Sequence, residues 1–159
     1  MIKAHLRKMS QFAAVVAVGL MMALTGNAFA ASGNSELGTW KMDPAKSKTN
    51  NKGVSNKIEA IGDSVKVTVD VYRADSESHY SYTVKFDGNF VKIDGVAASG
   101  DEVSATRIDA NTVRYAFKRA GKPAGTQTIV VSADGKTRTQ PMGDAAGKPN
   151  GTVQVYDRQ

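Results

Sequence analysis

Hydrophobic and polar residues alternate along much of this chain. The clearest case runs from Val65 to Tyr72, where every second residue is valine and the residues between are Lys, Thr, Asp and Tyr. A period of two places the valines on one face of a strand and the polar residues on the other. Gly62-Asp63-Ser64, just before it, has the composition of a tight turn. The pattern therefore predicts a half-buried strand entered through a hairpin from Ile58–Ile61.

Similar short patterns continue to the C-terminus and are separated by Gly, Asp, Asn and Pro. None has the period of a helix outside the first thirty residues. Regularly spaced short strands are typical of a barrel or a sandwich. We expect an all-β, antiparallel, up-and-down β-barrel of about 8–10 short strands, with a β-sandwich as the alternative. Besides the two above, the expected strands are 37–42, 80–86, 90–93, 103–108, 113–117, 126–131, 137–141 and 152–156.

The N-terminal segment has the pattern of a secretory signal. Lys3, Arg7 and Lys8 form a basic start, an uncharged apolar run extends from Phe12 to Leu24, and Ala28-Phe29-Ala30 offers small residues to a signal peptidase. The apolar run is shorter than the roughly 20 residues that a membrane span needs. No cysteine follows it, so the pattern is not that of a lipoprotein.

These observations predict three parts: a signal peptide over 1–30, a flexible leader over 31–36, and a single barrel domain over 37–159. Cleavage near Ala30-Ala31 would deliver the protein to the periplasm or the medium, without a membrane anchor. The remaining chain has 18 basic and 15 acidic residues, a net charge of +3. So small an excess, spread over many strands, does not indicate nucleic-acid binding. We expect a monomer.

A short repeat supports the meander. Ala120-Gly121-Lys122-Pro123-Ala124-Gly125-Thr126 recurs as Ala146-Gly147-Lys148-Pro149-Asn150-Gly151-Thr152, offset by 26 residues. Two strands with their turns fit that offset, so the repeat predicts the same turn at the same end of the sheet. Phosphate-binding loops open helices, and no helix is predicted here, so turn formation is the preferred interpretation.

Two short motifs carry a resemblance to a known family. Gly38-Thr39-Trp40 near the predicted mature start and Val155-Tyr156-Asp157-Arg158 at the end resemble the calycins, the lipocalin and fatty-acid-binding-protein group. Size and strand number look most like the fatty-acid-binding-protein branch. The chain also looks like a set of small exported bacterial proteins of uncharacterised function, which open with G-T-W-K and D-P-A-K-S-K.

The resemblance implies an up-and-down barrel around a cavity for an apolar ligand. Gly38 and Trp40 match the family's glycine and tryptophan, which pack the barrel base and are structural. Tyr156 matches a tyrosine that holds the ligand carboxylate in the fatty-acid binders, and Gln154 stands where those proteins have an arginine. Glutamine suits a neutral hydroxyl or carbonyl better than a carboxylate. The family's capping pair of helices has no room between Met42 and Ser55.

Aromatic residues are the other ligand-binding candidates. Tyr80, Tyr82 and Phe86 share one strand face, and Tyr115 and Phe117 share another. They either fill the core, as in most small barrels, or form the wall of a pocket in which phenolic hydroxyls orient a ligand. With Gln154 and Tyr156 they make up the candidate ligand-binding set.

The sequence offers little chemistry for catalysis. His79, the single histidine after the predicted signal, is out of phase with Tyr80 and Tyr82 and is expected to face solvent. Zinc sites and catalytic triads need convergent partners, which it lacks in sequence. The chain has no cysteine, no G-x-S-x-G motif and no tight acidic cluster. We therefore expect no enzyme, no metal site and no cofactor.

Two functions remain open at this point. One is an exported, non-enzymatic, lipocalin-like protein that binds a small apolar or amphipathic molecule in the barrel. The other is a protein-interaction module, an inhibitor or envelope stress protein, with a filled core and no ligand. Small or polar residues among bulky inward ones would favour the first.

Overall fold

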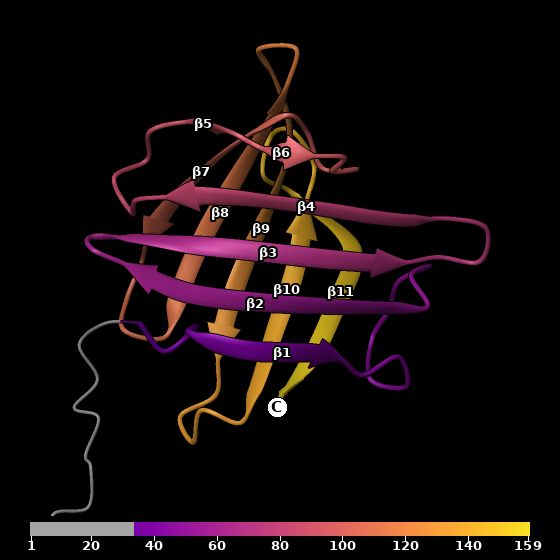
Figure 1. Cartoon of the computed structure of the whole chain (residues 1–159). Helices are drawn as coiled ribbons and strands as arrows, with labels where there is room; N and C mark the ends of the chain where they lie inside the picture. The colour runs from indigo at the N-terminus through magenta and orange to yellow at the C-terminus, as the bar shows by residue number, and fades with distance from the viewer. Residues whose placement is uncertain (1–33) are drawn as a thin grey trace, which may run out of the picture.

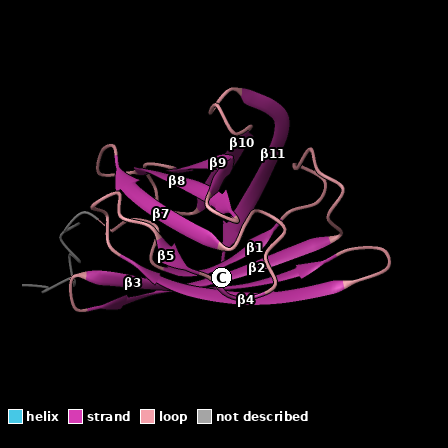
Figure 2. Cartoon of the chain, turned by 90° about the horizontal axis from the view of Figure 1, so that it is seen from above, coloured by secondary structure: helices cyan, strands magenta, loops and turns pink. Residues whose placement is uncertain are grey.

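One antiparallel sheet of eleven strands forms a nearly closed barrel in the computed structural model, which describes residues 34–159. The predicted signal peptide over 1–30 and the start of the predicted leader lie outside the described residues. Two layers of strands cross each other (Figure 1), and the view from above shows the space between them (Figure 2). The predicted barrel, rather than the sandwich, is confirmed.

The first layer contains the N-terminal strands and the second the C-terminal ones (Figure 1). The first comprises β1 (Gly38–Met42), β2 (Gly53–Ile61), β3 (Ser64–Tyr72) and β4 (Glu77–Val84). The second comprises β7 (Glu102–Arg107), β8 (Thr112–Arg119), β9 (Lys122–Val131), β10 (Thr137–Gly143) and β11 (Pro149–Arg158). The two-residue strands β5 (Val91–Lys92) and β6 (Asp94–Gly95) lie between the layers in sequence.

The strand order is that of an up-and-down meander. From β7 to β11 and from β1 to β4, each strand pairs with its sequence neighbour, and β11 pairs with β1 to join the two halves. At the other side β5 pairs with β7 and β6 with β4, and the Gly88 amide donates a 2.9 Å hydrogen bond to the Ala105 carbonyl. The barrel is therefore continuous through β11–β1 and closed only by short contacts near β5 and β6.

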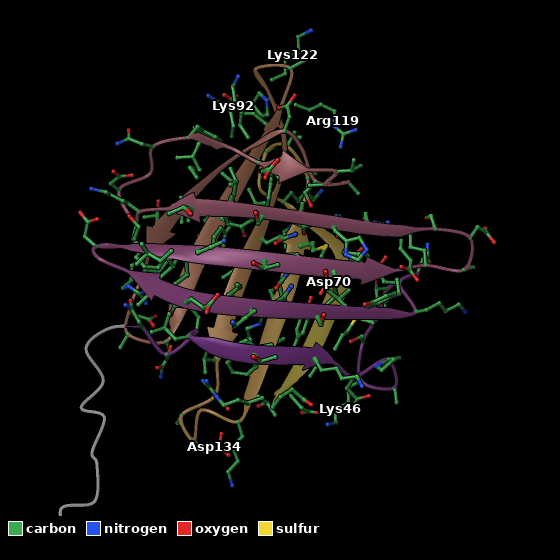
Figure 3. The ribbon with its side chains drawn as sticks, viewed as in Figure 1. Lys46, Asp70, Lys92, Arg119, Lys122 and Asp134 are labelled. Carbon is green, nitrogen blue, oxygen red and sulfur yellow. The ribbon has the colours of Figure 1, made fainter. Side chains whose placement is uncertain are left out.

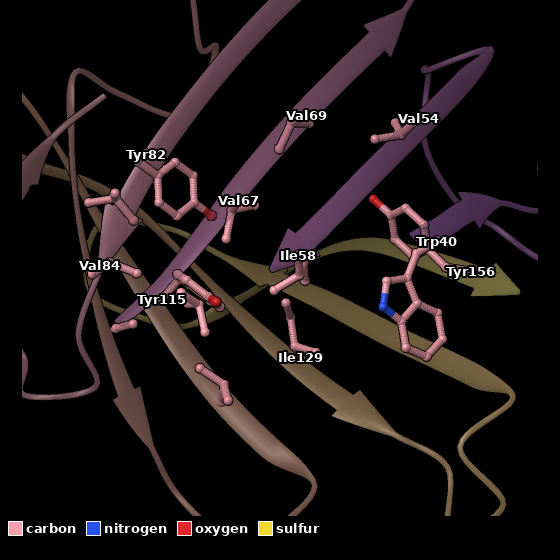
Figure 4. Close-up of a cluster of buried hydrophobic side chains, with 14 of the residues drawn as sticks. Trp40, Val54, Ile58, Val67, Val69, Tyr82, Val84, Tyr115, Ile129 and Tyr156 are labelled. Carbon is pink, nitrogen blue, oxygen red and sulfur yellow. The ribbon is translucent and has the colours of Figure 1, made fainter. Parts of the chain in front are cut away.

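The alternation of apolar and polar residues determines which side chains lie inside the barrel. All four β3 valines are at most 6% exposed, and they face buried residues of β8 and β9 across the barrel, Val113 and Ile129 among them. Trp40 is fully buried beside Tyr156 (Figure 4). Its indole Nε1 donates a 2.8 Å hydrogen bond to the Glu36 carbonyl. Trp40 is thus part of the buried core of the barrel.

Turns occur where the repeat places them. Ala120 and Gly121 have φ of 49° and 74° between β8 and β9, and Gly147 has φ of 80° between β10 and β11. Glycine enters this left-handed region without the steric cost that other residues meet. At Gly38, with φ of 116°, a Cβ would also lie 2.7 Å from an Arg158 Nη1. The position therefore requires glycine, in agreement with its predicted structural role.

Three predictions need correction. The strand expected over 90–93 is two-residue β5, and β6 follows it immediately, which raises the count above the expected range. Strand β4 ends at Val84, so Phe86 lies beyond it. The predicted flexible leader is wrong for residues 34–36: Glu36 is 1% exposed, and its carboxylate pairs with Arg107 at 2.7 Å. Because Arg107 supplies a countercharge, this segment is fixed to the barrel.

Candidate functional site

The barrel encloses a cavity of about 140 Å³ between its two layers. We call this space the internal cavity. One wall is apolar and comes from β2, β3 and β9, because their inward positions hold aliphatic residues. This apolar wall consists of Val54, Ile58, Val67, Val69, Val71 and Ile129.

The polar wall adjoins the apolar one, because Asn56 lies between Val54 and Ile58 on the inward face of β2. It comes from the inward positions of β10, β11 and β2, and it consists of Asn56, Arg138, Gln140, Gln154 and Tyr156. All five are at most 7% exposed. Tyr156 donates its hydroxyl to the Gln154 Oε1 at 2.8 Å, which fixes both side chains. A cavity lined by both apolar and polar side chains can orient an amphipathic molecule.

Arg138 is the one charged member of the polar wall. Its guanidinium Cζ lies 4.1 Å from the ring centroid of Tyr156 and 5.2 Å from that of Trp40. One amino group donates to the Asn56 Oδ1, while Nε has no hydrogen-bond partner. Burial holds the pKa of this guanidinium below its ordinary value, and the tyrosines around it oppose that change.

Three tyrosines complete the lining. The rings of Tyr80 and Tyr82 stack at 6.5 Å, and Tyr82 meets Tyr115 edge-on at 6.1 Å from the other layer (Figure 4). Burial raises the pKa of all three phenols above the ordinary value. The Tyr115 hydroxyl is buried and has no partner. These hydroxyls therefore stay neutral and can donate hydrogen bonds within the cavity.

The partly exposed lining residues mark the mouth of the cavity. They are Asn51, Arg73, Tyr80, Ala98, Ser99, Gln127 and Met142. Ala98, Ser99, Gln127 and Met142 also line a second hollow of about 270 Å³, which we call the outer cleft. Arg119, at the same end of the molecule as Lys92 and Lys122 (Figure 3), lines this cleft too. The segment at Ala98-Ser99 thus lies between the two spaces.

The structure brings together most of the candidate ligand-binding residues. Tyr80, Tyr82, Tyr115, Gln154 and Tyr156 all line the internal cavity. Phe86 and Phe117 are not among its lining residues.

Those two phenylalanines lie elsewhere for different reasons. Phe86 is past the end of β4, and its ring lies under the guanidinium of Arg107, 4.1 Å from Cζ. Phe117 is buried near the C-terminal end of β8, where it lines the outer cleft. Phe86 keeps the inward phase of Tyr82 and Val84 and packs against the hydrophobic core, but it lies outside the lining of the internal cavity.

His79 lies on the outer surface, as expected. Its side chain is 62% exposed, and its Nδ1 lies 2.7 Å from the Asp70 Oδ1. Asp70, which Figure 3 marks on the first layer, also accepts a 3.0 Å hydrogen bond from the Ser55 hydroxyl. Asp70 thus lies between the Ser55 hydroxyl and the His79 ring. Nucleophilic catalysis by a serine requires instead a direct hydrogen bond between the serine hydroxyl and the histidine ring.

Sequence reasoning missed three residues of the polar wall: Asn56, Arg138 and Gln140. Arg138 and Gln140 alternate with Thr137, Thr139 and Pro141, so a period of two was present. Polar residues on both faces concealed which face was inside.

Comparisons with known proteins leave the family open. The chain matches no protein-family model, and no curated protein matches it. Over residues 34–159 no helix is long and apolar enough to cross a membrane. Within the same residues no group of His, Cys, Asp and Glu side chains has the arrangement of a metal site.

Proposed function

We propose that this protein is an exported, non-enzymatic, lipocalin-like barrel that binds a small apolar or amphipathic molecule in its internal cavity. The observation that supports it is the cavity itself, with an apolar wall on β2, β3 and β9 and a polar wall beside it. A core used only for stability gains little from five buried polar side chains around one cavity, because each must be desolvated.

The volume of the internal cavity limits the size of the ligand that it can hold. A cavity of about 150 Å³ holds benzene, whereas pockets for drug-sized ligands have about 300–1,000 Å³. At about 140 Å³ the internal cavity fits a compact molecule of similar size. A longer ligand needs the outer cleft as well, and would pass the Ala98-Ser99 segment to reach it.

Native mass spectrometry of protein purified from its own source tests both parts of the proposal. We expect a retained small molecule and an intact mass that matches a chain beginning at Ala31 or within a residue or two. A chain that retains Met1 would contradict export. Repeated absence of a ligand would favour the protein-interaction module with a filled core.

A variant pair separates specific retention from adventitious binding. Val69→Phe places a ring in the internal cavity, so retention should be lost. Val130→Phe makes the same change at an exposed position on β9 and should leave retention intact. Overpacking costs about 1–3 kcal/mol, so the thermal midpoint of each variant is measured first.

A further inference from the structure

Asn150 is the one asparagine of this chain that precedes a glycine. Asn150 and Gly151 are both exposed and lie in the N-terminal part of β11. A backbone nitrogen can attack the side-chain carbonyl carbon of the preceding asparagine, which closes a succinimide ring. A Cβ on the attacking residue obstructs that approach, and glycine has none. This pair therefore has the composition in which ring closure meets the least steric obstruction.

The pairing of β11 with β10 is irregular at this position. Val153 of β11 lies opposite Pro141 of β10. Pro149 lies opposite Gly143, so residues 150–152 oppose a single residue of β10. Extra residues in one strand are left unpaired, and the hydrogen-bond ladder is disrupted locally. We call residues 150–152 the bulge; ring closure there breaks no regular pairing with β10.

The bulge also leaves room for a change of backbone conformation. Gly151 has φ of 85°, and a Cβ built on it would meet no other atom within 4 Å. Exposed segments with few packing contacts open most readily in folded proteins. The Gly151 nitrogen can therefore turn toward the Asn150 side chain without displacing a neighbour.

A hydrogen bond prepares the carbonyl that is attacked. The Thr152 amide donates a 3.0 Å hydrogen bond to the Asn150 Oδ1, so the side chain is held over its own backbone. Negative charge develops on this oxygen when a nitrogen adds to Cγ. A backbone N–H already directed at the oxygen stabilises that charge, as the donors of an oxyanion hole do. The Gly151 nitrogen is the nucleophile that the covalent chain keeps close to Cγ.

We infer that Asn150 is a site of spontaneous deamidation, and that the folded bulge promotes the attack by Gly151. The Gly151 nitrogen gives its proton to hydroxide and forms a bond to Cγ of Asn150. The bond from Cγ to the side-chain nitrogen breaks, and that nitrogen takes a proton from water and leaves as ammonia. Water then opens the succinimide at either of its two carbonyls. One product has aspartate at this position, and the other has isoaspartate, whose backbone runs through the former side chain.

The reaction adds a negative charge where two surface hollows meet. Asn150 lines the outer cleft, and together with Lys48 and Asn51 it lines a neighbouring hollow. Asn51 is also one of the mouth residues of the internal cavity. The new carboxylate therefore forms beside the mouth, in a hollow that a lysine also lines. The first copy of the repeat has Ala124 before Gly125, so it has no amide at the matching position.

Incubation of the purified, folded protein at neutral and mildly alkaline pH, followed by peptide mass spectrometry, tests this inference. We expect Asn150 to lose its amide faster as the pH rises, because hydroxide takes the Gly151 proton. The same measurement in urea at the same pH gives the rate without the bulge. We expect the folded rate to equal or exceed the unfolded rate. A folded rate below the unfolded rate, or no loss in either state, would overturn the inference.

Variants and an internal control assign the reaction to this pair. Asn150→Asp has the charge of one product and should co-migrate with the aged wild type in isoelectric focusing. Asn150→Ala reproduces the Ala-Gly-Thr of the first repeat copy, and its migration should not change with age. A shift in aged Asn150→Ala equal to that of the wild type would refute the assignment. Asn111, which is exposed and precedes a threonine, should keep its amide over the same period. Equal loss at Asn111 and Asn150 would show that exposure alone suffices, and would refute the role of the bulge.

Discussion

Truncating Trp40 to alanine should remove a large part of the stability of this protein. The side chain is fully buried, and two guanidinium groups lie over its ring, with Cζ of Arg158 4.2 Å and Cζ of Arg138 5.2 Å from the ring centroid. Its N–H donates to the Glu36 carbonyl, which fixes the segment that enters β1. One residue thus contacts both ends of the chain and the polar wall of the cavity.

The magnitude follows from these contacts. Burying a tryptophan makes its truncation cost about 3–5 kcal/mol. The hydrogen bond to Glu36 contributes about 1 kcal/mol, and the Arg158 stacking, at a partly exposed position, about 0.5–1 kcal/mol. A domain of this size has about 5–15 kcal/mol in total. These contributions predict that Trp40→Ala loses about 4.5–7 kcal/mol. The variant would therefore be unfolded if the total stability lies in the lower part of the range of about 5–15 kcal/mol.

Urea denaturation followed by far-ultraviolet circular dichroism measures this loss without relying on the removed fluorophore. Trp40→Phe is the matched variant: it keeps most of the apolar area and loses the N–H donor, so it should lose much less. Wild-type fluorescence should be blue-shifted and move to the red on unfolding. A loss below about 1 kcal/mol for Trp40→Ala, with red emission in the folded state, would refute the structural role of Trp40 in the barrel core.

Two further predictions concern buried groups elsewhere. Glu36→Gln should lose about 1.5–3 kcal/mol of unfolding free energy in urea denaturation, because it leaves Arg107, 21% exposed, without its carboxylate partner. The control is Lys57→Gln, in the exposed pair with Glu59, which should lose less than about 1 kcal/mol. Equal losses in the two variants would contradict the role of burial. The contribution of Tyr82 and Tyr115 to stability should be constant up to about pH 10, the tyrosine pKa in the unfolded chain. Above that pH stability should fall, because burial raises the folded-state pKa of both phenols and only the unfolded chain releases their protons there. Tyrosinate absorbance that rises at high pH without unfolding, in a Tyr72→Phe background that removes an exposed phenol, would contradict this sign.

The barrel was predictable where one strand face is uniformly apolar. The β3 valines predicted a strand, and the residues around Gly62 and Gly121 predicted turns. The folded structure has these elements at the same positions. Strand β6 had no such signal, because Asp94-Gly95 has the composition of a turn. Its backbone pairs with Tyr80 and Ser81 only because the closed barrel brings the two segments together.

The polar wall shows why the site was only half predictable. Tyr156 and Gln154 were found through a short resemblance at the end of the chain. Arg138 was not, because arginine is seldom buried and Thr137–Pro141 is a weak strand pattern. Its inward orientation follows from the register of β10, in which Arg138 pairs with Tyr156 on one side and Val131 on the other. Register between strands is a property of the whole sheet.

The pairing of β1 with β11 has a consequence for how the chain reaches its native state. Trp40 lies opposite Arg158, so β1 obtains its second neighbour from β11, the most distant of the described strands in sequence. Closing so long a loop costs entropy before any native contact repays it, and topologies rich in distant pairings fold in milliseconds to seconds. During synthesis, one edge of β1 therefore stays unpaired until β11 has been made.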